Sequence, residues 1–209
     1  MALVTRDVAE VASALRRGGL AVYPTETFYG LGALARDVRA IGRLAASKLR
    51  PPGKPLPLVA ADVDMAFGVW AGVPKAAAAL AARFWPGPLT IVCAAAPGLP
   101  AEVGGGGTVG VRVPGSPVAR ELARLSGGAL VSTSANVSGG PPVTRVSDLD
   151  PAIVAAVDAV LDGGPVPGGL PSTVVAVKGD ALSLVRSGAV PWEDVVAVAA
   201  HPALPSGEG

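Results

Sequence analysis

The amino-acid sequence predicts one α/β domain built around a mixed β-sheet. Segments with the hydrophobic spacing of helices alternate along the chain with short apolar segments typical of strands, and this alternation favours helices packed on a sheet. With 209 residues, half of them hydrophobic, the chain can bury one sizeable core. No internal repeat or linker divides it, so we expect residues 1–200 to form one domain and residues 201–209 to be a disordered tail.

Helices and strands alternate through the first half of the chain. Residues 6–17 repeat apolar side chains at helical spacing, and Gly18 and Gly19 end that pattern. Residues 20–23 follow as a buried strand that ends at Pro24. The next predicted elements are a helix over residues 37–49, a strand over residues 56–60 and an alanine-rich helix over residues 74–84.

The second half continues the same alternation. Ser116 followed by Pro117 is typical of a helix start, because a capping residue precedes a proline in the first turn. The other predicted elements are strands over residues 89–94, 108–113, 129–133 and 159–161, a helix over residues 147–157, and a hairpin of strands 173–177 and 182–185. The glycine-rich stretches 104–107 and 163–169 are expected to be mobile loops.

Composition and charge exclude several functional classes. The 17 basic and 16 acidic side chains leave a net charge of +1, which gives no overall field for nucleic acid or a membrane. Cys93 is the one cysteine, so no disulfide can form within the chain, which suits a reducing, cytoplasmic location. We expect no signal peptide and no membrane contact, because prolines interrupt the uncharged stretch 84–101. With one histidine, His201, no metal cluster is expected.

Polar segments lie where predicted strands begin or end, and the first two have two interpretations each. After the first strand, the hydroxyls of Thr25 and Thr27 suit either a bound carboxylate or phosphate, or the capping of a local turn. Lys48, Arg50 and Lys54 lie within seven residues. Three cations beside a proline-fixed loop suit either phosphate binding or a solvated helix end.

Two later segments add to this set. Alternation places Thr108 and Arg112 on one face of an apolar strand, where Arg112 needs an anion, either a structural carboxylate or a ligand carboxylate. Residues 132–138 carry hydroxyls and an amide without charge, which suits phosphate or ribose oxygens, and Ser172 and Arg186 repeat the theme. Together the segments predict a cleft for an anionic nucleotide and a second small anion, with catalysis by positioning and charge neutralisation.

Six motifs, taken in order, resemble those of the YrdC/Sua5 family: YPTETFYGLG, KLRPPGKPL, FWPGPLT, TVGVRVP, STSANVSG and LVRSG. The resemblance runs from about Leu15 to Gly188. It implies a twisted mixed sheet with a concave basic face, the YrdC-like fold. It also implies a nucleotidyltransferase reaction in which L-threonine, bicarbonate and ATP give threonylcarbamoyl-AMP and pyrophosphate, with Mg²⁺ carried on the ATP phosphates. Further proteins would then pass the threonylcarbamoyl group to adenosine 37 of tRNA.

The same resemblance implies roles for single residues. Those expected to bind threonine are Thr27, Arg112, Ser134 and Ser172. Those expected to bind ATP are Lys48, Arg50, Lys54, Thr108, Asn136, Thr144 and Arg186. Lys48 and Arg50 form the K-x-R pair expected on the phosphates and are the predicted catalytic residues. Val59 stands where some family members carry a histidine near threonine, and we expect no counterpart of the C-terminal domain of longer Sua5-type members.

An RNA-binding module without catalysis is the alternative interpretation. The family's concave basic face would suit double-stranded RNA or tRNA. A module of that kind should be strongly basic and carry aromatic side chains on which bases stack. Because the net charge is +1 and only 4% of the residues are aromatic, the sequence favours the enzyme and makes RNA contact secondary.

Overall fold

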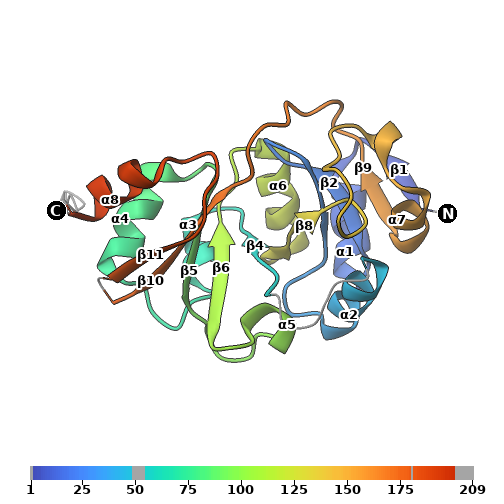
Figure 1. Ribbon diagram of the computed structural model, residues 1–209. Coiled ribbons are helices and arrows are strands. Elements are labelled where there is room, and N and C mark those ends of the chain that lie inside the picture. Colours follow the sequence, from blue (N-terminus) through green and yellow to red (C-terminus); the bar gives the residue numbers. More distant parts are fainter. Residues whose placement is uncertain (1, 49–54, 180, 201–209) are drawn as a thin grey trace.

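Two mixed β-sheets form the framework of the computed structural model, which describes residues 2–48, 55–179 and 181–200 (Figure 1). The strands of the first sheet, in spatial order, are β1 (Leu3–Thr5), β9 (Ala159–Leu161), β2 (Ala21–Pro24), β3 (Tyr29–Gly32) and β8 (Thr133–Ser134). Strand β9 runs parallel to β1 and β2, whereas β3 is antiparallel to β2 and β8.

The second sheet is longer and lies beside the first. Its strands, in spatial order, are β11 (Ala181–Arg186), β10 (Thr173–Lys178), β5 (Leu89–Ala94), β6 (Thr108–Arg112), β4 (Leu58–Val59) and β7 (Leu130–Val131). Parallel pairs join β10 to β5 and β4 to β6, and the other three pairs are antiparallel. The predicted hairpin is confirmed as β10 and β11, with Asp180 of its turn outside the described residues.

One segment of chain links the two sheets. Strand β7 pairs with β4 in the second sheet, and β8 pairs with β3 in the first, so the chain changes sheets at Ser132. The backbone N–H of Ser132 donates to the carbonyl of Pro57, which extends the β4–β7 register by one residue before the chain joins β3. The predicted mixed α/β architecture is confirmed, but two sheets stand where one was expected, and the strand expected over 129–133 is divided.

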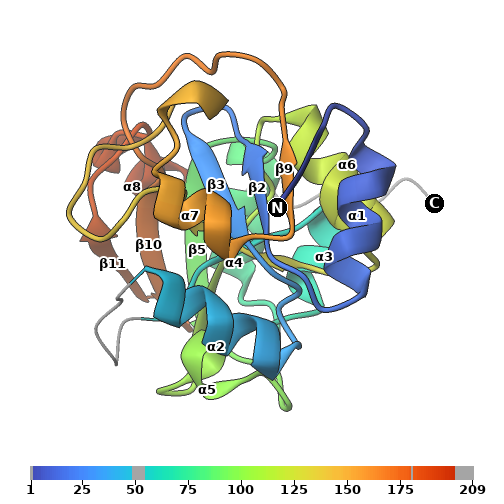
Figure 2. The same ribbon diagram turned by 90° about the vertical axis from the view of Figure 1, so that its right-hand side faces the viewer.

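Helices cover both faces of the first sheet (Figure 2). The helices α1 (Val8–Arg16) and α6 (Pro117–Ser126) pack together on one face, and α2 (Val38–Ser47) and α7 (Pro151–Ala156) pair on the other. Alternation along β2 explains both layers, because Tyr23 packs with the α1 and α6 side chains whereas Val22 packs with the larger core.

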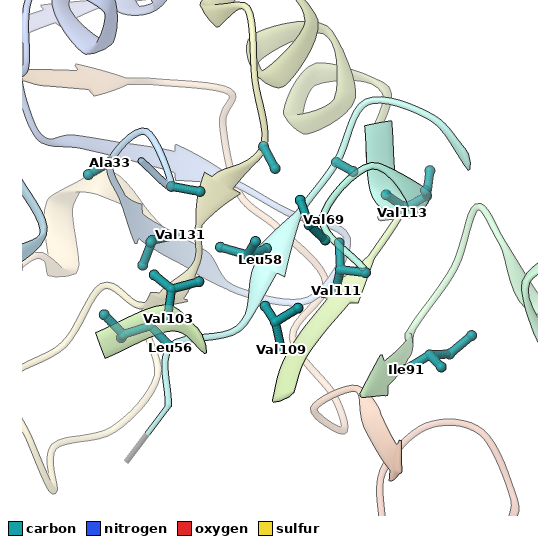
Figure 3. Packing of buried hydrophobic residues seen from close by; sticks show 14 of the residues in the cluster. Ala33, Leu56, Leu58, Val69, Ile91, Val103, Val109, Val111, Val113 and Val131 are labelled. Atoms are coloured by element: carbon teal, nitrogen blue, oxygen red, sulfur yellow. The ribbon is translucent and has the colours of Figure 1, made fainter. Parts of the chain in front are cut away.

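The main core continues into the second sheet. The helices α4 (Lys75–Phe84) and α8 (Trp192–Ala200) pack on each other and cover one face of that sheet, near the short helix α3 (Val63–Phe67). Leu58 of β4 lies between Val111 of β6 and Val131 of β7, all fully buried (Figure 3). Leu56, which precedes β4, lies at the end of this layer together with Val103 of the short helix α5 (Ala101–Gly104).

Side-chain caps begin several helices, and the helix start expected at Ser116 is confirmed. The side chains of Asp7, Asp37 and Ser116 each accept a hydrogen bond from a backbone N–H in the first turn of α1, α2 and α6. The helix expected over residues 147–157 is shorter, because the 3₁₀ turn Val146–Asp148 precedes an Asp150 cap with Pro151 in the first turn. Five elements were not expected: β1, β3, α3, α5 and α8. The tail expected at 201–209 lies outside the described residues.

Candidate active site

A cavity of about 470 Å³ lies where the two sheets meet, and we call it the small cavity. Two arginines and several serines and threonines line it: Thr25, Thr27, Thr90, Arg112, Ser132, Thr133, Ser134, Ser172 and Arg186. All four residues expected to bind threonine are among them. None of the described residues that line it is acidic.

The turn between β2 and β3 forms one wall of the small cavity. The Thr25 hydroxyl donates to the carbonyl of Phe28 at 2.7 Å and accepts from the backbone N–H groups of Thr27 and Phe28, each at 3.3 Å. Thr25 therefore caps the local turn, as one of the two interpretations held. The Thr27 hydroxyl, 3.4 Å from that of Thr25, faces the same cavity.

Arg112 on β6 has an ion-pair partner that lies far away in the sequence. Its Nη1 donates to Oε1 of Glu26, in the β2–β3 turn, and the two side chains are only 11% and 21% exposed. Of the two anions that the sequence left open, the structural carboxylate is thus present. This bond is the one that the Arg112 side chain makes among the described residues, and Arg112 still lines the small cavity.

Arg186, at the end of β11, has no carboxylate partner among the described residues. Its Nε and Nη2 donate to the carbonyl oxygen of Ser172 at 3.2 and 2.7 Å, and Nη2 also lies 3.1 Å from the Ser172 hydroxyl. Burial, together with the positive charge of Arg112, lowers the pKa of Arg186. Two guanidinium groups that repel each other across one cavity favour the binding of an anion between them.

Gly188 fixes the position of this contact. A Cβ atom at Gly188 would lie 2.3 Å from the carbonyl oxygen of Pro171 and 2.5 Å from backbone atoms of Ser172 and Thr173. Only glycine therefore lets the chain after Arg186 cross the start of β10 so closely. The Arg-Ser-Gly motif found in the sequence thus serves both the guanidinium contact and the crossing.

Lys48 is buried beside residues 134–136, which we call the Ser-x-Asn segment. Its ammonium donates to the backbone carbonyls of Ser134 and Asn136, the latter at 2.6 Å, and the Ser138 hydroxyl donates to the Lys48 carbonyl at 2.5 Å. Lys48 is 3% exposed and does not line the small cavity. Its contacts with the described residues therefore hold the Ser-x-Asn segment in place. Arg50 and Lys54, the other predicted cations, lie outside the described residues.

A larger groove of about 1490 Å³ adjoins the small cavity. It runs over the face of the second sheet that α4 and α8 leave uncovered, across β5, β6, β10 and β11. Thr108 lines the groove, and Thr90, Ser172 and Arg186 line both spaces. A Cβ at Gly110 would lie 3.2 Å from methyl groups of Thr90 and Val92, so the glycine keeps the groove floor flat.

Asn136 and Thr144, the other described residues expected to bind ATP, line neither the small cavity nor the groove. The Asn136 side-chain amide donates to the carbonyl of Gly140, and the Thr144 carbonyl accepts from the N–H of Val166 at 3.0 Å. Both belong to loops around the cavity. Within the glycine-rich stretch 163–169, Gly164 accepts from the Tyr29 hydroxyl at 2.7 Å and Gly168 donates to the Thr27 carbonyl at 2.9 Å, so this stretch is tied to the β2–β3 region.

Sequence reasoning missed two groups at the site. Thr90, in an otherwise apolar strand, is 3% exposed, and its hydroxyl lies 3.0 Å from that of Ser172. A lone hydroxyl at an alternating strand position was the available signal. Tyr23 does not line the small cavity but lies near Ser132, Arg112 and Glu26, and burial raises its pKa to about 12. Its phenol therefore remains neutral at physiological pH.

Two absences concern residues 2–48, 55–179 and 181–200. No group of three or more His, Cys, Asp or Glu side chains there is placed to hold a metal ion. No helix in the same ranges is both long and apolar enough to cross a membrane.

Comparison with known proteins identifies the family. The family model for Sua5, YciO and YrdC proteins, described as "Telomere recombination", matches residues 13–188. The chain belongs to the Sua5/YciO/YrdC family. It is 35% identical over 200 residues to the threonylcarbamoyl-AMP synthase of Bacillus subtilis, covering 94% of this chain and 58% of the relative. A putative threonylcarbamoyl-AMP synthase of Mycobacterium tuberculosis is 35% identical over 93% of this chain and 89% of its own length.

Solved structures of the family share the fold. The Sua5 protein of P. abyssi, whose structure was determined in complex with L-threonine, superimposes with a TM-score of 0.85 at 33% identity, covering 95% of this chain and 60% of that chain. The chain thus spans less than two thirds of the length of the B. subtilis and P. abyssi proteins. The expected YrdC-like fold is confirmed, and the positive charge expected on its concave face remains a prediction.

Proposed function

We propose that the chain joins L-threonine, bicarbonate and ATP to form threonylcarbamoyl-AMP and pyrophosphate. One observation carries this proposal: the four residues expected to bind threonine surround one cavity, and that cavity shares Arg186 with a groove large enough for a nucleotide. The names of the relatives from B. subtilis and M. tuberculosis support the reaction. The threonine complex of the P. abyssi protein supports the amino acid.

Threonine would occupy the small cavity. Its carboxylate would bind the Arg112 guanidinium, which keeps free donors beside the Glu26 contact. The hydroxyls of Thr27, Ser134 and Ser172 surround the same space and can pair with the threonine hydroxyl or its amino group. A site that pairs a substrate hydroxyl rejects analogues without one far more strongly than a purely apolar pocket does.

ATP would occupy the groove. The flat floor at Gly110, with the methyl groups of Thr90 and Val92, suits a planar base, and Thr108 lies on the same face. The triphosphate would reach the edge shared with the small cavity, where Arg186 supplies positive charge. Arg50 and Lys54 are proposed to add to this charge, while Lys48 would position the Ser-x-Asn segment from behind.

The chemistry requires two bonds to form. The threonine nitrogen bonds to the carbon of bicarbonate with loss of water, and an oxygen of the resulting carbamate attacks the α-phosphorus. The bond from that phosphorus to the bridging oxygen breaks, and pyrophosphate leaves. Since no acidic residue and no histidine lines the small cavity among the described residues, catalysis would rest on alignment of the reactants and on neutralisation of phosphate charge.

The proposed metal ion accompanies a substrate, and the proposed partner proteins use the product. No carboxylate cluster among the described residues offers a cage for Mg²⁺, so the ion would arrive on the ATP phosphates and help to neutralise them. The product is a mixed anhydride, which reacts readily with nucleophiles. We propose that further proteins of the same compartment, the cytoplasm, pass its threonylcarbamoyl group to adenosine 37 of tRNA.

Pyrophosphate release tests the proposal. Purified protein with ATP and Mg²⁺ should release pyrophosphate only when both L-threonine and bicarbonate are present. Omitting either one should reduce the rate to background. Pyrophosphate release that continues without threonine would contradict the proposed reaction. If no pyrophosphate is released with ATP, threonine and bicarbonate all present, the chain would be a family member that lacks this activity.

A further inference from the structure

Glu26 has no role in the function proposed so far, and its placement is unusual. It lies between Thr25 and Thr27, both of which line the small cavity, but Glu26 itself does not. Its side chain turns the other way, so that a Cβ at Gly115 would lie 3.6–3.8 Å from its Cβ, Cγ and Cδ atoms. Oε1 pairs with Arg112, and Oε2 is buried without a hydrogen-bond partner among the described residues. An acidic group therefore stands directly behind a cationic ligand contact.

The charges around the small cavity explain why a carboxylate in this position matters. Arg112 and Arg186 both line the cavity, and the Arg112 side chain is only 11% exposed. Without Glu26 the two guanidinium groups would form a doubly positive pocket, which would attract any small multivalent anion. Phosphate and pyrophosphate are such anions, and the proposed reaction produces pyrophosphate next to this cavity. A threonine subsite must therefore be protected from the products of its own reaction.

Glu26 offers that protection through charge. It cancels the charge of Arg112 at contact distance but occupies only one edge of the guanidinium. Its second oxygen makes no hydrogen bond among the described residues that would weaken its negative potential. A zwitterionic amino acid carries no net charge, and its ammonium group is attracted by Glu26. A multivalent phosphate gains less from Arg112 and is repelled by the carboxylate behind it.

We propose that Glu26 is a specificity-determining residue, which acts through Arg112 to make the small cavity select an amino acid over inorganic phosphates. It does not touch the substrate, so it is a positioning residue. The inference rests on the proposed function, because threonine is the ligand that the cavity is proposed to take.

Calorimetric titration of two ligands, without ATP, tests this inference. L-threonine and inorganic phosphate are titrated separately into the wild-type protein and into Glu26→Gln, which keeps the size and the acceptor oxygen but removes the charge. We expect phosphate to bind the variant at least about tenfold more tightly and threonine about tenfold more weakly. If Glu26 had a purely structural role, its replacement would weaken the binding of both threonine and phosphate. Unchanged or weaker phosphate binding in the variant would overturn the inference.

Three further variants make the result specific. Glu121→Gln removes the same charge from the exposed Glu121–Arg124 pair on α6 and should change neither affinity. Adding Arg112→Ala to Glu26→Gln should abolish the gain in phosphate binding, and a gain that persists would place the phosphate elsewhere. Glu26→Asp keeps the charge and should not gain phosphate affinity even if Glu26→Gln fails to fold. If the wild-type protein binds no threonine, the proposed function fails, while the phosphate titrations still decide the role of Glu26.

Discussion

Arg112 and Arg186 face the same cavity but are held in different ways. Arg112 is anchored by a carboxylate, whereas Arg186 is anchored by a carbonyl and a hydroxyl that leave its charge uncompensated. A guanidinium whose charge is uncompensated binds a phosphate more strongly than one that is already paired with a carboxylate. We therefore propose different ligands for the two arginines, the triphosphate for Arg186 and the amino-acid carboxylate for Arg112.

Replacing Arg186 tests the first assignment. Arg186→Ala should lower the rate of pyrophosphate release by about 10²–10³, which is typical for the loss of one charge contact in the transition state. Steady-state release measured at saturating threonine provides the comparison. Arg124→Ala, at an exposed ion pair on α6, is the matched control and should retain full activity. Near-normal turnover of Arg186→Ala would remove this residue from the reaction.

Replacing Arg112 tests the second assignment. Arg112→Lys keeps the charge but loses the planar fork that can hold Glu26 and a substrate carboxylate at the same time. We expect threonine binding to weaken much more than ATP binding when both are measured by calorimetry. If threonine affinity is unchanged, Arg112 does not belong to the substrate site. If tRNA affinity and its salt dependence change instead, Arg112 serves RNA.

The partner of Arg112 shows a limit of sequence reasoning at this scale. The strand pattern predicted that Arg112 needs an anion, and that prediction is confirmed by Glu26. The sequence did not identify the carboxylate, because the two residues lie 86 positions apart and meet only when β6 packs beside the β2–β3 turn. Local periodicity contains no information about such a contact.

At the scale of elements, Lys48 joins the end of α2 to the Ser-x-Asn segment. Its buried ammonium serves two backbone carbonyls in a stretch that contributes only the two-residue strand β8. Short strands have few ladder hydrogen bonds of their own, so a side chain that satisfies their neighbouring carbonyls can determine whether the segment is ordered.

Removing this contact should destabilise the protein. Lys48→Met keeps the length of the side chain but leaves two carbonyls without a donor, and each such loss costs about 1–3 kcal/mol. Urea denaturation should show a lower free energy of unfolding, together with reduced pyrophosphate release. Lys75→Met, at the exposed start of α4, is the control and should unfold like the wild type. A change below about 0.5 kcal/mol for Lys48→Met would contradict this role.

Elements with clear periodicity were predictable, and those shaped by close packing were not. The helices α1, α2 and α4 and the strands β5 and β6 follow from hydrophobic spacing, and the start of α6 follows from its Ser116 cap. Strand β3 was missed because its Gly30 and Gly32 resemble a loop. A Cβ at Gly32 would lie 2.4 Å from the Val131 carbonyl, so that glycine reflects tight packing against the neighbouring segment.

At the scale of the whole molecule, the site exists only because two sheets meet. The small cavity takes residues from β3, β4, β6 and β8, which belong to both sheets, and the groove takes its floor from the second sheet alone. The polar segments and their joint function could be proposed from the sequence. Their division between two adjoining spaces could not, because it depends on where the chain passes from one sheet to the other.

Weak binding of RNA is expected at this scale. A chain with a net charge of +1 has little overall attraction for a polyanion. Unfractionated tRNA should therefore bind weakly at about 0.15 M salt, a physiological ionic strength, and should not alter the rate of pyrophosphate release. Filter binding over a range of salt concentrations, beside the release assay, measures both. Tight binding or turnover that requires tRNA would favour the RNA-binding interpretation.

The origin of the carbamoyl carbon tests the central claim most directly. The wild-type protein and the Arg112→Lys variant are each incubated with ATP, Mg²⁺, L-threonine and ¹³C-bicarbonate. The adenylate product of each is then analysed by mass spectrometry. We predict a threonylcarbamoyl adenylate that carries the ¹³C label and forms in step with pyrophosphate, and much less of it from the variant at the same threonine concentration. An adenylate without the label, or a labelled product formed equally by the variant, would contradict the account.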